Sequence, residues 1–203
     1  MTLQKRTDKY GGSFENRTRL LVDIIQAIRA VMPETMPLLV RISATEWMEW
    51  SGQESWDVPQ SVRLAKLLPA LGVDLLDVSS GGNNAEQKIE LHTYYQIDIA
   101  GHIRQALGTS SPMKIGAVGM VTTAEIARDV VEEAEIDDGT VEMVESTTKQ
   151  KTKADLVLAA RQFLREPEFV LRVAHQLGVD VKWPVQYSRA QWPAKGAKLT
   201  SIP

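Results

Sequence analysis

Gly116-Ala117-Val118-Gly119 and Ala159-Ala160-Arg161 each end a short apolar stretch, and together they show how this chain is built. The stretches are residues 113–118 and 154–160, and two more of the same kind occupy 37–43 and 73–79. All four have the length of a strand and are bounded by glycine, proline or polar residues, which predicts strands buried on both faces. Their starts lie 36, 40 and 41 residues apart, which leaves room for a helix after each strand.

Helical periodicity fills the spaces between these strands. A helix is predicted first at residues 14–31, and others at 58–71, 95–107, 123–133 and 168–177. Most of them end at a glycine or a proline. The alternation indicates an α/β protein with a parallel sheet covered by helices. Two architectures fit: an open doubly wound sheet, or half of a (β/α)8 barrel, which in complete form has about 250 residues.

Composition narrows the class of protein. The 203 residues suffice for one domain, and the net charge of -3 gives no overall basic field for nucleic acid or an anionic membrane. The absence of cysteine excludes disulfides and thiolate metal sites. No apolar run spans a bilayer and residues 1–6 lack the apolar core of a signal peptide, so we expect a cytoplasmic protein without membrane or nucleic-acid partners.

Two segments interrupt the repeats. Residues 132–148 contain seven acidic residues and no basic one, and lysines follow up to 153. The segment 132–153 is therefore predicted to be a solvated insertion, since it lacks the spacing of metal ligands. The chain after residue 181 has no periodicity, and 193–203 is predicted to be a flexible tail after a domain of residues 1–192.

The strand ends carry the candidate chemistry. Gly119 follows the third strand and Arg161 the fourth, and bare backbone amides beside a guanidinium are suited to a phosphate. Arg41 lies inside the first strand, where we expect it to be buried and either paired with an acid or used to stabilise charge on a bound ring.

Other polar positions are less specific. Asp77, Ser79 and Ser80 either line a pocket or form a hydrogen-bonded turn. Tryptophans at positions 47, 50 and 56 follow the first strand, where lids and interfaces form more readily than core. No Ser-His-Asp, HExxH or paired histidine and carboxylate spacing is present.

Several motifs, taken together, resemble one family. Residues 6–19 read RTDKYGGSFENRTR, and VRISA (40–44), VDLLDVSSG (73–81), GAVGM (116–120), RQFLREP (161–167) and PVQYSR (184–189) follow. The long polar run is specific to the Old Yellow Enzyme family of FMN-dependent ene-reductases, and the last motif is similar to its bacterial, YqjM-like branch. The resemblance covers residues 4 to about 192.

The resemblance implies a (β/α)8 TIM barrel of which this chain is the C-terminal half, strands five to eight. It implies that Arg41 contacts the pyrimidine edge of the flavin and that Val118, Gly119, Ala160 and Arg161 belong to the FMN site, the last three at the phosphate. The family usually has glycine at Ala160, and a methyl group fits there if φ is negative. Arg189 is implied to reach the site of a neighbouring subunit in a homodimer.

The activity implied is hydride transfer from NADPH or NADH through FMN to an activated alkene. The family's proton-donating tyrosine and its His/Asn substrate-binding pair lie in the first half of its barrel. We therefore expect a truncated chain that holds cofactor-binding residues but no catalytic residue and no metal. The alternative is an inactive half-barrel that acts by associating with a complementary chain or a second copy.

Overall fold

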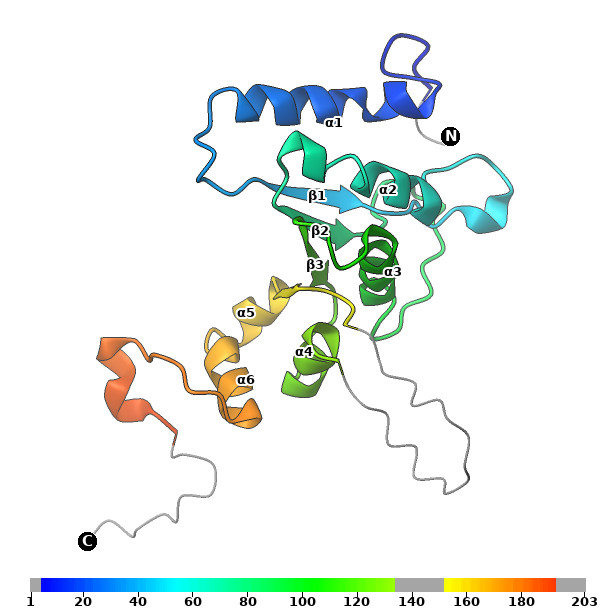
Figure 1. Cartoon of the computed structure of the whole chain (residues 1–203). Coiled ribbons are helices and arrows are strands. Elements are labelled where there is room, and N and C mark those ends of the chain that lie inside the picture. Colours follow the sequence, from blue (N-terminus) through cyan, green and yellow to red (C-terminus); the bar gives the residue numbers. More distant parts are fainter. Residues whose placement is uncertain (1–4, 134–151, 193–203) are drawn as a thin grey trace, which may run out of the picture.

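The computed structural model describes residues 5–133 and 152–192, and Figure 1 shows their arrangement. Most of the predicted acidic insertion and the whole predicted tail lie outside the described residues. The elements follow in the order α1 (Phe14–Arg29), β1 (Leu39–Ser43), η1 (Glu49–Ser51), α2 (Val58–Ala65), η2 (Pro69–Leu71), β2 (Leu75–Ser79), α3 (Ile97–Leu107), β3 (Lys114–Val118), α4 (Ala124–Val131), β4 (Leu156–Leu158), α5 (Arg161–Arg165), α6 (Phe169–Leu177) and η3 (Val185–Ala190).

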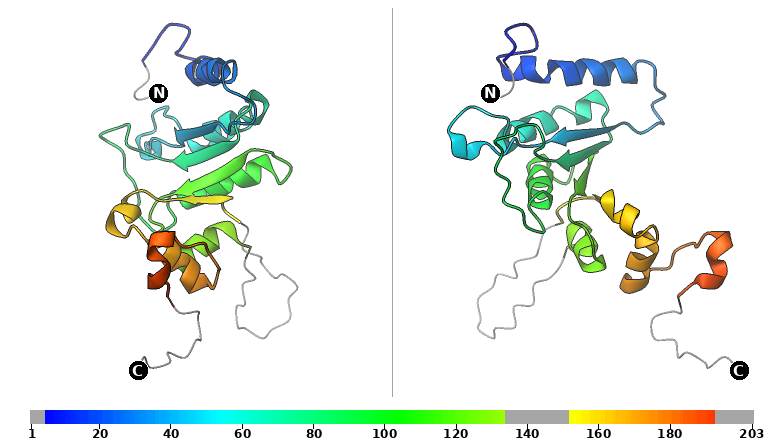
Figure 2. Two further views of the ribbon diagram at one scale, coloured as in Figure 1. Left: turned by 90° about the vertical axis from the view of Figure 1, so that its left-hand side faces the viewer. Right: turned by 180° about the vertical axis from the view of Figure 1, so that it is seen from behind.

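The strands form one parallel sheet in the order in which they occur in the chain. The order is β1-β2-β3-β4, and every neighbouring pair is parallel. A doubly wound sheet must reverse its order at a switch point, whereas a barrel adds each strand beside the last. Because parallel crossovers are right-handed, this order places successive helices on the same side of the sheet. The structure is therefore a partial TIM barrel, with α1 beyond β1 and the C-terminal helices beyond β4 (Figures 1 and 2).

The two faces of the sheet differ in burial. On the helix side, Leu76, Val78 and Ile115 are at most 1% exposed and belong to the hydrophobic core. On the opposite face, which would be the inside of a barrel, Leu39 is 56% and Leu156 is 45% exposed. The alternation is the ordinary period-two pattern of a strand. The sequence predicted burial on both faces, and for this inner face that prediction is wrong at both outer strands.

The Asp74 carboxylate ties the amino-terminal ends of β1 and β2 to each other and to α1. Arg29, at the end of α1, donates from Nε to the Gly72 carbonyl at 2.8 Å and from a terminal nitrogen to Asp74. The Asp74 carboxylate also accepts a 2.7 Å hydrogen bond from the Leu38 amide. That amide, and then the Arg29 guanidinium, lower the pKa of Asp74. The cluster joins α1 to the sheet across more than forty residues of chain.

Three predicted elements need correction. The single helix expected over 58–71 is divided into α2 and η2, because Pro69 has no amide hydrogen to continue the helix. A short helix, α5, follows β4 directly and was not predicted. The segment after residue 181, for which the absence of periodicity predicted an extended chain, includes the 3-10 helix η3, near which Trp183 and Trp192 pack edge to face with ring centroids 5.3 Å apart.

The tryptophans after β1 were also misjudged. Trp56 stacks on Phe14 with ring centroids 6.0 Å apart, and its indole nitrogen donates to Ser61. Trp47 packs against the core, while Trp50 is 51% exposed. Core packing therefore explains two of the three. Of the helices described, none is both long and apolar enough to cross a membrane.

Candidate functional site

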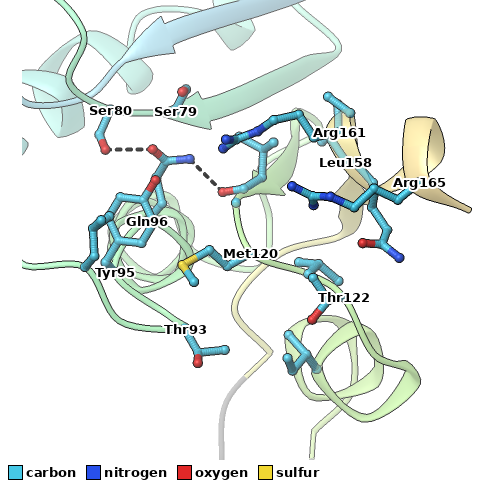
Figure 3. Close-up of a pocket in the computed structure, with 18 of the residues that line it drawn as sticks. Ser79, Ser80, Thr93, Tyr95, Gln96, Met120, Thr122, Leu158, Arg161 and Arg165 are labelled. Atoms are coloured by element: carbon cyan, nitrogen blue, oxygen red, sulfur yellow. Dashed lines mark hydrogen bonds between the residues drawn. The ribbon is translucent and has the colours of Figure 1, made fainter.

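A cavity of about 620 Å³ opens at the carboxyl ends of β2, β3 and β4. Its volume lies in the range of small-molecule and cofactor sites. Figure 3 shows Arg161 and Arg165 entering it from α5, opposite Tyr95 and Gln96. The walls are formed by Arg41, Ser79, Ser80, Leu91, Thr93, Tyr95, Gln96, Val118, Gly119, Met120, Val121, Thr122, Ile126, Leu158, Ala159, Ala160, Arg161, Gln162 and Arg165.

A strained turn forms the floor of this cavity. Gly119 has φ +117°, a value that L side chains rarely adopt, and a Cβ at this position would lie 2.9 Å from Gln96 Nε2. The next residue, Met120, also has positive φ, at +54°. Positive φ at a non-glycine residue costs about 1–2 kcal/mol. The surrounding structure therefore imposes this conformation, and strain of this kind is common at binding sites.

The charge of the cavity is positive. Arg41, Arg161 and Arg165 line it, and no acidic residue is among the described residues that do so. Guanidinium groups bind phosphate and carboxylate oxygens through paired hydrogen bonds. The cavity is therefore suited to an elongated anionic ligand that meets arginine at two separate points, β1 and α5.

Arg41 is not buried as predicted. Its side chain is 57% exposed, and its Nε donates to the Asp77 carboxylate, which is 7% exposed. Arg41 and Asp77 are register partners on β1 and β2, on the inner face that the described residues leave open. The ion pair expected for Arg41 is present, and the side chain also lines the cavity.

Ala160 has the negative φ that its methyl group was predicted to require. It has φ -126° and precedes the first residue of α5. The negative φ meets the condition set for alanine, because only a positive φ would favour glycine at this position. Ala160 and Arg161 line the same cavity as Val118 and Gly119.

The cavity also contains a hydrogen-bond network that the sequence did not reveal. Gln96 is 5% exposed, and its Nε2 donates to the Val118 carbonyl at 2.8 Å. Its Oε1 accepts from Ser80 Oγ at 2.7 Å, and Ser80 Oγ in turn accepts from Trp47 Nε1 at 3.0 Å. The chain of bonds joins the loop after β1 to the ends of β2 and β3, as the dashed lines in Figure 3 show in part.

The structure thus brings most of the predicted site residues together. Arg41, Val118, Gly119, Ala160 and Arg161 share one cavity, with Ser79 and Ser80 from the predicted rim. Asp77 lies beneath Arg41 instead of on the wall. Arg189 is exposed in η3 and is not among the lining residues. Met120 and Arg165 lay inside two motifs of the family resemblance but were assigned no role, and Gln96 had no distinguishing signal in the sequence.

Comparison with known proteins agrees with this geometry. Residues 1–180 match the family described as NADH:flavin oxidoreductase / NADH oxidase. The chain is 40% identical over 200 residues to an NADH:flavin oxidoreductase of Gibberella zeae, covering 95% of this chain and 43% of that protein. It is 35% identical to an NADPH dehydrogenase of Bacillus velezensis, covering 91% of this chain and 46% of the relative.

A solved structure shows the same architecture. A complex of 2-naphthoyl-CoA reductase aligns with a TM-score of 0.52 and 25% identity, over 62% of this chain and 19% of that one. The present chain spans less than half the length of these curated relatives. The family match over most of the chain and these identities lead to one conclusion: the chain belongs to the NADH:flavin oxidoreductase / NADH oxidase family, that of Old Yellow Enzyme.

Proposed function

We propose that the cavity is an FMN site and that the chain contributes it to an NAD(P)H-dependent flavin oxidoreductase of the ene-reductase type. The observation that carries the proposal is the pairing of the Gly119 turn with Arg161 across the ends of β3 and β4. Family membership supports flavin as the anionic ligand, and the names of the relatives support NADPH or NADH as reductant. FMN held by Arg41, Gly119 and Arg161 would supply hydride transfer from the nicotinamide to the β-carbon of an activated alkene, and the proton for the α-carbon would come from an acid outside this chain.

The residues of the cavity fit such a ligand. Gly119 has no side chain that would block a phosphate, and a Cβ there would press on Gln96. Arg161 and Arg165 supply fixed positive charge beside it. Arg41 would meet the ring portion, where a cation stabilises developing negative charge. Its bond to Asp77 holds the guanidinium at the rim.

A second possibility rests on the sheet edges. β1 and β4 each pair with one neighbour in the described structure, and the inner-face side chains Leu39 and Leu156 beside them are exposed. Unpaired edges and exposed apolar residues favour association with other strands. Under this alternative the chain has no activity alone and functions in association with a complementary chain. In the first proposal, Arg189 reaches the site of a neighbouring subunit in a homodimer.

Titration with FMN, followed by flavin fluorescence and absorbance, tests the first proposal. We expect saturable binding by the purified chain, and at least tenfold weaker binding by Arg161→Met, because a charge-assisted hydrogen bond is lost. Arg63→Met is the matched control, since Arg63 lies on α2 with its side chain 59% exposed and away from the cavity.

The outcomes separate the two candidates. Saturable binding that depends on Arg161 but not Arg63 supports the FMN site. No flavin binding by the chain at any concentration contradicts that proposal. NADPH or NADH oxidation, measured at 340 nm with FMN bound, then distinguishes a working reductase from a chain that needs a partner.

A further inference from the structure

We propose that Gln96 is a positioning residue that holds the Gly119–Met120 turn in the conformation that receives the phosphate of the ligand. The inference rests on the proposed FMN site. It assigns a role to a residue that contacts both the turn after β3 and Ser80 at the end of β2. The observations that carry it are two hydrogen bonds and the strain of the turn.

The turn has little internal support. Apart from bonds within helices and strands, no backbone hydrogen bond of the described residues involves the N–H or C=O of Met120 or Val121. Side chains hold the turn from outside: Gln96 donates to the Val118 carbonyl before it, and Arg172 donates to the Thr122 carbonyl after it. Amides without internal partners remain available to an anion.

Strain makes this external support necessary. Gly119 and Met120 have consecutive positive φ values of +117° and +54°, and the strain lies at Met120, because glycine adopts positive φ at no steric cost. A turn of this kind relaxes unless its surroundings over-determine it. Gln96 lies against it, since its Nε2 is 2.9 Å from the position of an added Cβ at Gly119. The Gln96 amide thus fixes the direction of the Val118 carbonyl and occupies the space beside Gly119.

Gln96 is itself fixed on its other side. Its Oε1 accepts from Ser80 Oγ, and Trp47 Nε1 donates to that hydroxyl. The Ser80 hydroxyl accepts a hydrogen bond from Trp47 and donates its own hydrogen to Gln96. The Gln96 side chain must therefore direct its oxygen towards Ser80 and its nitrogen towards the turn, which fixes the orientation of the amide. Trp47 has φ +55°, so this end of the network is also held in a conformation that needs support. The network transmits the position of β2 to the turn after β3.

The test compares FMN with riboflavin, which has the same ring and lacks the phosphate. Gln96→Met removes both hydrogen bonds at similar volume and adds no charge. We expect its affinity for FMN to fall roughly tenfold, the effect of one lost buried hydrogen bond, with a much smaller change for riboflavin. A merely structural role would weaken both flavins alike. Ser80→Ala should give a smaller loss of the same kind, and it carries the test if Gln96→Met does not fold.

The matched control is Gln105→Met, the same change at an exposed position of α3. It should leave both affinities unchanged. The 15N–1H spectrum of the free chain gives a second readout: Gln96→Met should shift or broaden the Gly119, Met120 and Val121 signals, and Gln105→Met should not.

The results distinguish failure of this inference from failure of the FMN proposal. Equal losses for FMN and riboflavin, or unchanged signals from the turn, contradict the role of Gln96 while the FMN site stands. If the unmodified chain binds neither flavin, the FMN site is contradicted and the phosphate role of Gln96 with it. In that case, shifted signals from the turn would show that Gln96 fixes the turn, but not that the turn binds a phosphate.

Discussion

At the scale of single residues, Gly119 is the most constrained position of the site. Gly119→Ala would place a methyl group 2.9 Å from Gln96 Nε2 at a φ of +117°. We expect the free energy of unfolding to fall by about 1–3 kcal/mol and FMN affinity to fall at least tenfold. Urea unfolding and FMN titration of the same preparations measure the two effects.

Gly178→Ala provides the control for the general cost of positive φ. Gly178 ends α6 at φ +71° with no atom within 4 Å of an added Cβ. It should lose about 1–2 kcal/mol of stability and keep its flavin affinity. If both variants lost flavin binding equally, the effect at Gly119 would be one of stability alone.

The residues of the cavity differed in how far they could be predicted. Gly119 and Arg161 stand at the ends of apolar strands, where a glycine or a charge is conspicuous in the sequence. Gln96 begins no motif, and its importance depends on the Val118 carbonyl and Ser80 hydroxyl that the fold brings to it. The burial of Arg41 was mispredicted because strand periodicity does not show which face remains open.

At the scale of elements, Asp74 links α1, β1 and β2, and its pKa is lowered by the Leu38 amide and Arg29. A carboxyl group with a lower pKa in the folded state stabilises the fold above its unfolded pKa of about 4, and this contribution is lost as the pH falls through the folded pKa. Asp74→Asn should therefore destabilise the chain at pH 7, by about 1 kcal/mol because the side chain is 52% exposed.

Urea unfolding at pH 7 and pH 3 measures this dependence. The difference in stability between Asp74→Asn and the unmodified chain should shrink at the lower pH, because protonation of Asp74 removes the charge that the Leu38 amide and Arg29 stabilise in the folded state. A difference that stayed constant with pH would contradict the electrostatic account. Asp23→Asn, a change of the same kind on α1, is the control.

Most elements were visible in the sequence for simple reasons. The strands are short apolar runs and the helices have one apolar stripe, so their existence follows from periodicity. Their limits depend on local chemistry: Pro69 divides one predicted helix, and Thr123 caps α4 by accepting from the Ile126 amide. The 3-10 helix η3 has no periodic signal, and the aromatic contacts beside it, Trp192 with Trp183 and with His175, involve residues that flank it in the chain.

At the scale of the whole molecule, the inner face and the two sheet edges predict association. We expect the chain to self-associate with rising concentration, or to bind a partner that supplies strands. Leu156→Lys should weaken the association constant at least tenfold, since burying a leucine contributes about 1.5–3 kcal/mol. Light scattering coupled to size exclusion measures the mass at several concentrations.

Leu67→Lys is the matched control, because Leu67 is 44% exposed and lies between α2 and η2, away from the inner face. It should leave the mass distribution unchanged. A strictly monomeric chain at high concentration, with no effect of either change, would contradict association through the open face.

The order of the strands has a further consequence, for how the chain folds. Each strand pairs with the one synthesised before it, and no strand waits for a distant segment. Sheet growth can therefore follow synthesis from β1 towards β4, with a loop-closure cost that is similar at each step. β4 has three residues and joins last, so its amides should exchange with solvent sooner than those of β2 and β3. A nascent chain would thus complete the walls of its cavity only when Arg161 emerges, after the rest of the sheet has formed.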